Sequence, residues 1–298
     1  MGGMVAHRGA SMFQRSGPST VGEYARDYGL IHAVRPNTLH QYRIVADLFE
    51  RWAGGPVRLV DLDERSVSAW LRDLGQTHAP ATCRSKRVGL LALWRAAAEE
   101  GLCDPPARRV RSVPVPIVTV EAWDADEVRR LLATVRTLRG RHPCGLSRPE
   151  WWDLAIRVAW DTGLRRGDQF RLAVASVQPD GTGWWTQSKT GRPVAFRLAD
   201  GTLGMLRASL ERAPRKLVCP WEASLEGFAS QFRRIVRIAG VRPGTWKWLR
   251  RGSASDVEAQ VPGEGAAQVG HAPGSRVAAI HYLAPRLCGK RRAYPHPL

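Results

Sequence analysis

The side chains best suited to take part in chemistry lie in the segment 161–168, where Arg165 stands between two apolar flanks. The Trp-rich segment 151–160 precedes it, and Thr162-Gly163 is typical of the end of a helix. Because Gly167-Asp168 is typical of the start of the next helix, Arg165 is predicted to lie at a helix–helix corner. A guanidinium held there is preorganised to bind a phosphate through two parallel hydrogen bonds. By itself the segment fits a surface arginine pair better than a site, so its interpretation depends on the residues downstream.

Three further segments carry cationic or nucleophilic side chains in a fixed order. The first is a predicted β-hairpin turn, and the second is a Trp-rich helical pattern. The third is a Gly-His pair followed eleven residues later by a tyrosine. The side chains, in order, are Lys189, Lys247, Arg250, His271 and Tyr282. Taken singly, each has an ordinary explanation: a lysine on an exposed turn, a histidine in a loop, a tyrosine in the core face of an amphipathic helix.

Taken together, these motifs resemble the tyrosine recombinases, the integrase family of site-specific DNA strand-transfer enzymes. That family carries TGLR with an acidic residue three positions on, KTG on a hairpin turn, HxLR, GH and a nucleophilic tyrosine. The matching residues here span about 120 positions and are Arg165, Asp168, Lys189, Arg250, His271 and Tyr282. The chain departs from the pattern twice. The histidine of HxLR falls on Lys247, and Tyr282 lies eleven residues after His271 where nine is usual in the family.

The resemblance implies transesterification at a DNA phosphodiester, with Tyr282 as the nucleophile and a 3′-phosphotyrosyl bond as the intermediate. Arg165 and Arg250 are expected to hold the two non-bridging oxygens of the phosphate. Lys189 is expected to be the general acid for the leaving 5′ oxygen. No metal, ATP or other cofactor is expected, since the phosphotyrosyl bond conserves the energy of the broken bond.

The remaining matches have supporting roles by the same resemblance. His271 is expected to hydrogen-bond the phosphate or the attacking oxygen, and Lys247 to donate a further charged hydrogen bond. Asp168 is expected to orient an arginine. The partner implied is double-stranded DNA with a specific recombination site, bound by a homotetramer that joins two sites. The resemblance also implies an origin in a phage or another mobile element.

Two other functions stay open at the level of the sequence. A catalytically impaired DNA-binding relative would explain Lys247 and the shifted tyrosine as signs of decay. A type IB topoisomerase-like enzyme would share the chemistry but cut one strand of a single duplex. Formation of a covalent adduct separates the recombinase from the first alternative, and a need for two sites separates it from the second.

Composition and charge limit the class of protein. The 298 residues are 44% hydrophobic and 24% charged, as in a globular protein, and the net charge is +18. Such an excess favours a polyanionic partner, most commonly nucleic acid, although a generally basic proteome gives the same balance. The chain shows no apolar run long enough to span a membrane and no apolar signal-peptide core at its start. We therefore expect a cytoplasmic, DNA-associated protein.

The cysteines indicate neither a metal site nor a disulfide framework. They are five in number and widely spaced, without a CxxC pair. A reduced cytosol is the simplest setting for such a set. Near the C-terminus, nothing in the sequence marks Cys288 as catalytic.

The expected fold class is mainly α with a small antiparallel β-sheet. Residues 1–18 lack any period and are predicted to be disordered. Residues 19–104 carry helical patterns opened by Pro36, Asp63 and Pro80, and resemble the helical, SAM-like core-binding domain of the family. Residues 105–117 contain four prolines and are predicted to be an extended linker. Residues 118–298 are predicted to be a mixed α+β catalytic domain of the tyrosine-recombinase type.

Two groups of basic residues are candidates for contact with DNA phosphates. One lies in the first turns of the helix opened by Pro80, and the other lies between the two pairs of prolines in the linker. Their members are Arg84, Lys86, Arg87, Arg108, Arg109 and Arg111. A solvated helix face and an inert basic linker are the corresponding structural alternatives.

Within the catalytic domain, residues 183–198 are predicted to form a β-hairpin whose turn includes Lys189. Two helices are expected before the hairpin. One begins at Asp124, and the other ends at the Arg165 corner. After it, helical patterns cover residues 202–213, 223–239, 245–259, 264–270 and 274–283. The last of these includes Tyr282, which Val277, Ala278 and Ile280 are expected to dock on the core.

Overall fold

A computed structural model of the protein describes residues 19–107, 109–116, 118–272 and 274–288. The predicted disorder of residues 1–18 and the proposed phosphate contact of Arg108 lie outside these ranges. The chain divides into two compact units, residues 1–117 and 118–298, each of which is described by itself.

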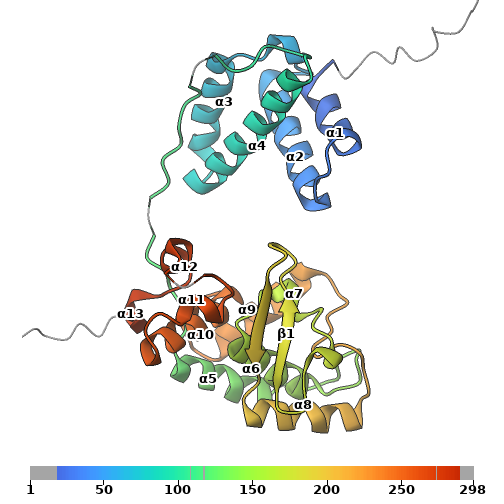
Figure 1. Ribbon diagram of the computed structural model, residues 1–298, viewed down its shortest axis with the longest axis vertical. Helices are drawn as coiled ribbons and strands as arrows, with labels where there is room; N and C mark the ends of the chain where they lie inside the picture. Colours follow the sequence, from blue (N-terminus) through green and yellow to red (C-terminus); the bar gives the residue numbers. More distant parts are fainter. Residues whose placement is uncertain (1–18, 108, 117, 273, 289–298) are drawn as a thin grey trace, which may run out of the picture. The chain divides into compact units, whose positions relative to one another are not determined.

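In the first unit, the described residues form a bundle of four α-helices (Figure 1). They are α1 (Val21–Ile31), α2 (Pro36–Ala53), α3 (Glu64–Thr77) and α4 (Pro80–Glu99), with the short 3-10 turn η1 (Leu59–Asp61) before α3. The Asp63 carboxylate caps α3 by accepting from the backbone N–H groups of Arg65 and Ser66. Gly54 ends α2 with a left-handed φ of 86°. Large buried rings from the helices, including Tyr24, Phe49, Trp70 and Trp94, fill the core.

The first part of the predicted linker packs on this bundle. Residues 104–116 form no helix or strand where the structure describes them. The Trp94 indole donates to the carbonyl of Asp104 at 2.8 Å, and Val110 is only 4% exposed. Arg87 donates to the carbonyls of Arg111 and Val110 at 2.8 and 3.1 Å. This segment is therefore an extended strap fixed to the first unit up to about residue 111.

The second unit packs its helices around the buried α6. Its elements before the sheet are α5 (Ala125–Arg136), α6 (Arg148–Thr162), α7 (Arg166–Gln169) and η2 (Val174–Ser176). After the sheet come α8 (Asp200–Arg212), α9 (Leu225–Ile238), α10 (Lys247–Gln260), α11 (Gly265–Gln268), α12 (Arg276–His281) and α13 (Pro285–Cys288). Trp151 and Trp152 of α6 contact Phe228 and Phe232 of α9, as well as Trp246, in one aromatic cluster.

The sheet consists of two antiparallel strands, β1 (Thr182–Thr186) and β2 (Pro193–Arg197). Trp184 pairs with Ala195, and the turn between the strands holds Lys189, as predicted. Alternate residues of β2, Val194 and Phe196, are buried. In Figure 1 this hairpin reaches from near α8 toward α7, while α11, α12 and α13 gather beside α10. The expected fold class is confirmed.

The end of the chain differs from the expected helix at 274–283. The helix α12 ends at His281, and Tyr282 is the first residue beyond it. Tyr282 leaves helical geometry with a φ of −127°, and the N–H of the next residue, Leu283, also donates to the Ala278 carbonyl, at 3.2 Å. Ala278 is buried, but Val277 and Ile280 are 51% and 47% exposed. The apolar pattern therefore does not dock this helix as predicted.

Candidate active site

Arg165 lies at the helix–helix corner that its neighbours predict. The helix α6 ends at Thr162, and Gly163 follows with a φ of 56°. Arg165 is the residue before α7, and the buried Leu164 fixes the corner on the core. One guanidinium nitrogen of Arg165 donates to the side-chain oxygen of Gln187, which is 1% exposed. The arginine is therefore held by a buried partner rather than left to solvent.

Arg250 of α10 contacts the same corner and is buried, with only 4% of the residue exposed. Its Nη1 donates to the carbonyl of Gly163, and its Nη2 donates to the carbonyl of Val269 at 2.7 Å. Burial lowers the pKa of its guanidinium to about 10, so the group stays charged at neutral pH. Among the described residues, Nε of Arg250 has no hydrogen-bond partner. A buried cation with an unused donor is suited to binding an anion.

Tyr282 lies against this arginine. The Arg250 Cζ is 4.8 Å and the Lys247 Nζ is 5.4 Å from the centre of the Tyr282 ring. Burial alone would raise the pKa of the phenol. The charges of Arg250, Arg165 and Lys247, with a hydrogen bond from Arg250, outweigh burial and hold the Tyr282 pKa below its ordinary value of 10.0. The phenolate is thus easier to form here than in water.

A cavity of about 460 Å³ joins these groups. Its walls come from the Arg165 corner, the hairpin turn, the start of α10 and the residue after α12. The predicted catalytic residues that line it are Arg165, Lys189, Lys247, Arg250 and Tyr282. Lysines and arginines from separate elements thus surround one phenol, which is the arrangement needed to hold a phosphate diester next to a nucleophile.

Asp168 supports the lysine turn. This carboxylate is 1% exposed, and its Oδ1 accepts from the backbone N–H and the hydroxyl of Ser188 at 3.1 and 2.6 Å. Ser188 directly precedes Lys189, so Asp168 fixes the turn from which the lysine projects. The arginine that Asp168 pairs with is Arg171, at 3.5 Å. Its charge also acts on Arg250, where it opposes the lowering of the guanidinium pKa, and its expected role of orienting a catalytic arginine stays a prediction.

His271 lies beside the phenol ring of Tyr282. Its ring centre is 5.3 Å from that of Tyr282, and its backbone N–H donates to Ala266 at 2.9 Å. Burial, followed by the charges of Arg250, Arg165 and Arg192, lowers the His271 pKa below its ordinary 6.5. The lowered pKa favours the neutral form of the imidazole. Its Nε2 is buried and has no partner among the described residues.

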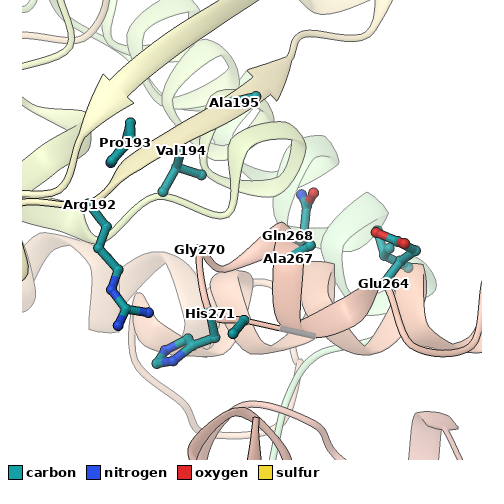
Figure 2. Close-up of a pocket in the computed structure, with 11 residues that line it drawn as sticks. Arg192, Pro193, Val194, Ala195, Glu264, Ala267, Gln268, Gly270 and His271 are labelled. Atoms are coloured by element: carbon teal, nitrogen blue, oxygen red, sulfur yellow. The ribbon is translucent and has the colours of Figure 1, made fainter. Parts of the chain in front are cut away.

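A second cavity, of about 430 Å³, lies on the far side of His271 between β2 and the α10–α11 region. Figure 2 shows the guanidinium of Arg192 pointing toward the His271 ring, with Glu264 at the opposite end. Arg192 contributes to the lowered His271 pKa and was not among the residues predicted from the sequence. Its place in the same segment as Lys189 was the signal available.

Gln187 is the other residue that sequence analysis missed. Its Oε1 accepts from Arg165 and from the Thr190 hydroxyl, and its Nε2 donates to the Val269 carbonyl at 3.3 Å. It therefore connects the arginine corner, the lysine turn and the segment before His271. Gly270 has a φ of 64°, and a Cβ there would lie 2.1 Å from Gln187 Nε2. The glycine of the Gly-His pair is thus required by this close approach.

The candidate phosphate contacts of the first unit differ in availability. Arg84, Arg109 and Arg111 are exposed, whereas Arg87 uses its guanidinium on the linker backbone. Lys86 is half-buried. Their contact with DNA stays a prediction.

Within the described ranges, no group of three or more His, Cys, Asp or Glu side chains is placed to hold a metal ion. No described helix is long and apolar enough to cross a membrane.

Comparison with known proteins gives a match at the level of structure. No protein-family model matches the sequence, and no curated protein matches it either. A lambda integrase dimer bound to a COC′ core site is 22% identical, has a TM-score of 0.69, and covers 94% of this chain and 81% of that chain. The Tn1549 transposon integrase in complex with circular intermediate DNA is 11% identical, has a TM-score of 0.66, and covers 89% of this chain and 95% of that chain.

The XerH site-specific recombinase bound to a palindromic difH substrate is similar over a smaller part. It is 16% identical, has a TM-score of 0.60, and covers 78% of this chain and 73% of that chain.

Proposed function

We propose that this chain, which has the fold of the tyrosine recombinases, is a site-specific DNA recombinase that works through a 3′-phosphotyrosyl intermediate. The observation that carries the proposal is the cavity in which Tyr282 meets Arg165, Lys189, Lys247 and Arg250. The net charge of +18 and the DNA-bound state of the similar lambda integrase and XerH structures support duplex DNA as the substrate.

The first step is cleavage. The phenolate oxygen of Tyr282 forms a bond to phosphorus as the bond from phosphorus to the 5′ oxygen breaks. Arg165 and Arg250 bind the non-bridging oxygens, where negative charge increases in the transition state. Since both guanidinium groups are already fixed by Gln187 and by main-chain carbonyls, little reorganisation is needed during the reaction.

Two protons move in this step. Lys189 gives a proton to the leaving 5′ oxygen, which is otherwise a poor leaving group. His271 is neutral and lies in ring contact with Tyr282, so it is suited to accept the phenol proton. Lys247 stays a donor, and its charge helps to hold the phenolate. No metal or nucleotide is used, because these cations stabilise the charge and the phosphotyrosyl bond stores the energy.

The second step is strand transfer. A 5′ hydroxyl from another strand attacks the phosphotyrosyl phosphorus, which releases Tyr282 and joins the strands in a new arrangement. This exchange requires two duplexes, and we propose that a homotetramer holds them. A lambda integrase tetramer bound to a Holliday junction has the same fold, with a TM-score of 0.70. The similarity to a transposon integrase supports an origin in a mobile element.

The test uses a duplex selected from a random-sequence library by binding to the full chain, then nicked at staggered positions. A nick just 3′ of the cleavage point makes the fragment with the 5′ hydroxyl short enough to diffuse away. Without this fragment the reaction cannot reverse, so the adduct is trapped. We expect a covalent protein–DNA adduct with the wild type, with the nucleotide mapped to Tyr282. Tyr282→Phe should bind the duplex with unchanged affinity and form no adduct.

Three results would contradict the proposal. An adduct mapped to Tyr294, which lies outside the described residues, would show that the eleven-residue spacing had misplaced the nucleophile. DNA binding with no adduct on any nicked duplex would favour a non-catalytic relative. Relaxation of plasmids without any need for two sites would favour a topoisomerase.

A further inference from the structure

The helix α10 continues past Arg250 with a side chain that holds the chain next to the nucleophile. The Nε of Arg251 donates to the carbonyl of His281 at 3.1 Å. Its Nη1 donates to the carbonyl of Glu121 at 3.2 Å, at the start of the second unit. Arg251 thus ties the end of α12, one residue before Tyr282, to two separate parts of the unit.

One turn further along α10, Ser255 holds the other side of the nucleophile. It is fully buried, and its Oγ accepts from the backbone N–H of Ala284 at 2.8 Å. The same oxygen is 3.4 Å from the carbonyl of Tyr282 and 2.7 Å from that of Arg251. A hydroxyl has one proton, so it donates to one of these carbonyls at a time while still accepting from Ala284.

These contacts matter because α12 itself gives the nucleophile little support. The helix α12 has only six residues and ends at His281, so Tyr282 gains no further helical support. Of this short helix, Ala278 is buried while Val277 and Ile280 stay exposed. The next buried side chain is Ala284. Apart from the bonds to α10, the N–H groups of Tyr282 and Leu283 both donate to the Ala278 carbonyl, at 2.9 and 3.2 Å.

The same helix also contacts the ring of the nucleophile. Lys247 and Arg250 place their charges over the Tyr282 ring, and Arg251 and Ser255 reach the neighbouring backbone. Residues three and four apart in a helix share a face, so one rigid element reaches ring and backbone together.

We propose that Arg251 and Ser255 are positioning residues for the nucleophile, which hold the main chain on both sides of Tyr282 so that its hydroxyl stays in line with the leaving oxygen. The inference rests on the proposed strand-transfer function and deepens it. Attack on phosphorus requires in-line geometry, and a small displacement of a reacting group costs a large factor in rate.

The test compares two buried serines of α10. Ser255→Ala removes the hydroxyl that holds residues 282 and 284. Ser253→Ala is the matched control. Ser253 is 1% exposed, donates to the Trp160 carbonyl at 2.5 Å and accepts from Nε2 of Gln268 at 2.8 Å, so its hydrogen bonds lie away from residues 282–284. At saturating nicked duplex, Ser255→Ala should form the adduct at least about tenfold more slowly than wild type, with a dissociation constant within about twofold. Ser253→Ala should retain the wild-type rate.

Two further readouts separate positioning from general damage. If the phenol moves away from Arg250, its pKa rises, so the pH–rate profile of Ser255→Ala should shift to higher pH. Damage to folding would lower the rate without this shift. Hydrogen exchange of the peptide 278–288, measured without DNA, should be faster in Ser255→Ala than in wild type or Ser253→Ala.

The inference fails if Ser255→Ala forms the adduct at the wild-type rate, or loses rate only as far as it loses binding. If Ser255→Ala does not fold, Arg251→Lys gives the same comparison, because it keeps the charge and lacks the Nε donor. A wild-type chain that forms no adduct overturns the strand-transfer function itself. Unchanged hydrogen exchange at 278–288 instead overturns the positioning contacts, whether or not the chain cleaves DNA.

Discussion

At the scale of single residues, the two groups proposed to transfer protons lie in different surroundings. Lys189 projects from an exposed turn, whereas His271 lies in a partly buried position surrounded by arginines. A cationic setting keeps an imidazole neutral, and a neutral imidazole can accept a proton. The two residues are thus suited to opposite ends of one displacement, with His271 at the attacking oxygen and Lys189 at the leaving one.

The pH dependence of cleavage tests the histidine. Because the His271 pKa is lowered from 6.5, its neutral form should persist as the pH falls through that value. The acid limb of the adduct rate should therefore have its midpoint below about 6.5. His271→Gln should be slower and should lose this limb. An acid midpoint above 7 in the wild type would show that the arginines do not control this ring.

The lysine is tested by changing the leaving group. Lys189→Ala should slow adduct formation on an ordinary strand by about a hundredfold or more, as expected for loss of a general acid. Replacing the bridging 5′ oxygen by sulfur gives a leaving group that needs no proton, so the variant should recover most of its rate. An equal loss on both substrates would assign Lys189 to DNA binding instead.

What the sequence could predict at this scale follows from the kind of contact. Arg165, Arg250 and Tyr282 could be proposed from the sequence because each stands in a motif that the family carries in a fixed order. Gln187 and Ser255 were not, because their importance comes from partners 22 and 29 residues away in the chain. Asp168 was recognised, but its contact with Ser188 depends on how the hairpin turn packs against α7. Tertiary partners of this kind have no local signature.

At the scale of elements, α13 and the start of α5 are joined by a cluster of charges around Glu127. This carboxylate is 4% exposed and accepts from Arg242 at 2.8 and 2.7 Å and from Arg286 at 3.4 Å. Burial raises the pKa of Glu127, but the hydrogen bonds and charge of Arg242 outweigh it and leave the pKa below 4.5. The charged carboxylate therefore stabilises the fold above that pH and loses its contribution as the pH falls below it.

Removing one partner of this cluster should be costly. Arg242→Ala leaves the Glu127 charge buried with weaker pairing, so we expect a loss of about 3 kcal/mol in the free energy of unfolding. Arg129→Ala, which breaks an exposed pair with Asp126, should cost less than about 1 kcal/mol. Urea unfolding of the full chain, followed by tryptophan fluorescence, measures both. Similar losses in the two variants would mean that Glu127 is not the buried anchor described here.

The element boundaries show a second limit of sequence patterns. The apolar period correctly predicted the existence of a helix before Tyr282, yet it placed the end too late. The backbone already leaves helical geometry at Tyr282, and the buried side chain of the following segment is Ala284 rather than Ile280. Apolar residues in a six-residue helix therefore indicate its type better than they indicate its packing.

At the scale of the whole molecule, the charge of +18 predicts a binding constant that depends steeply on salt. Each neutralised phosphate releases counterions, so about six contacts give a slope near −5 in a plot of log K against log salt. Replacing Arg109 and Arg111 together by alanine should reduce the magnitude of this slope by about two. Arg129→Ala serves as the control. A slope unchanged by the double replacement would make the strap inert toward DNA.

The carbonyls that hold Arg250 limit which substitutions evolution can accept at positions 163 and 269. Both acceptors, at Gly163 and Val269, belong to the backbone, so no point mutation can delete either of them. A substitution can only move these carbonyl groups. At position 163 even a methyl group would lie 2.6 Å from the Gln268 carbonyl oxygen. Descendants of this gene that still cleave DNA should therefore exchange one apolar residue for another at position 269 while keeping glycine at 163.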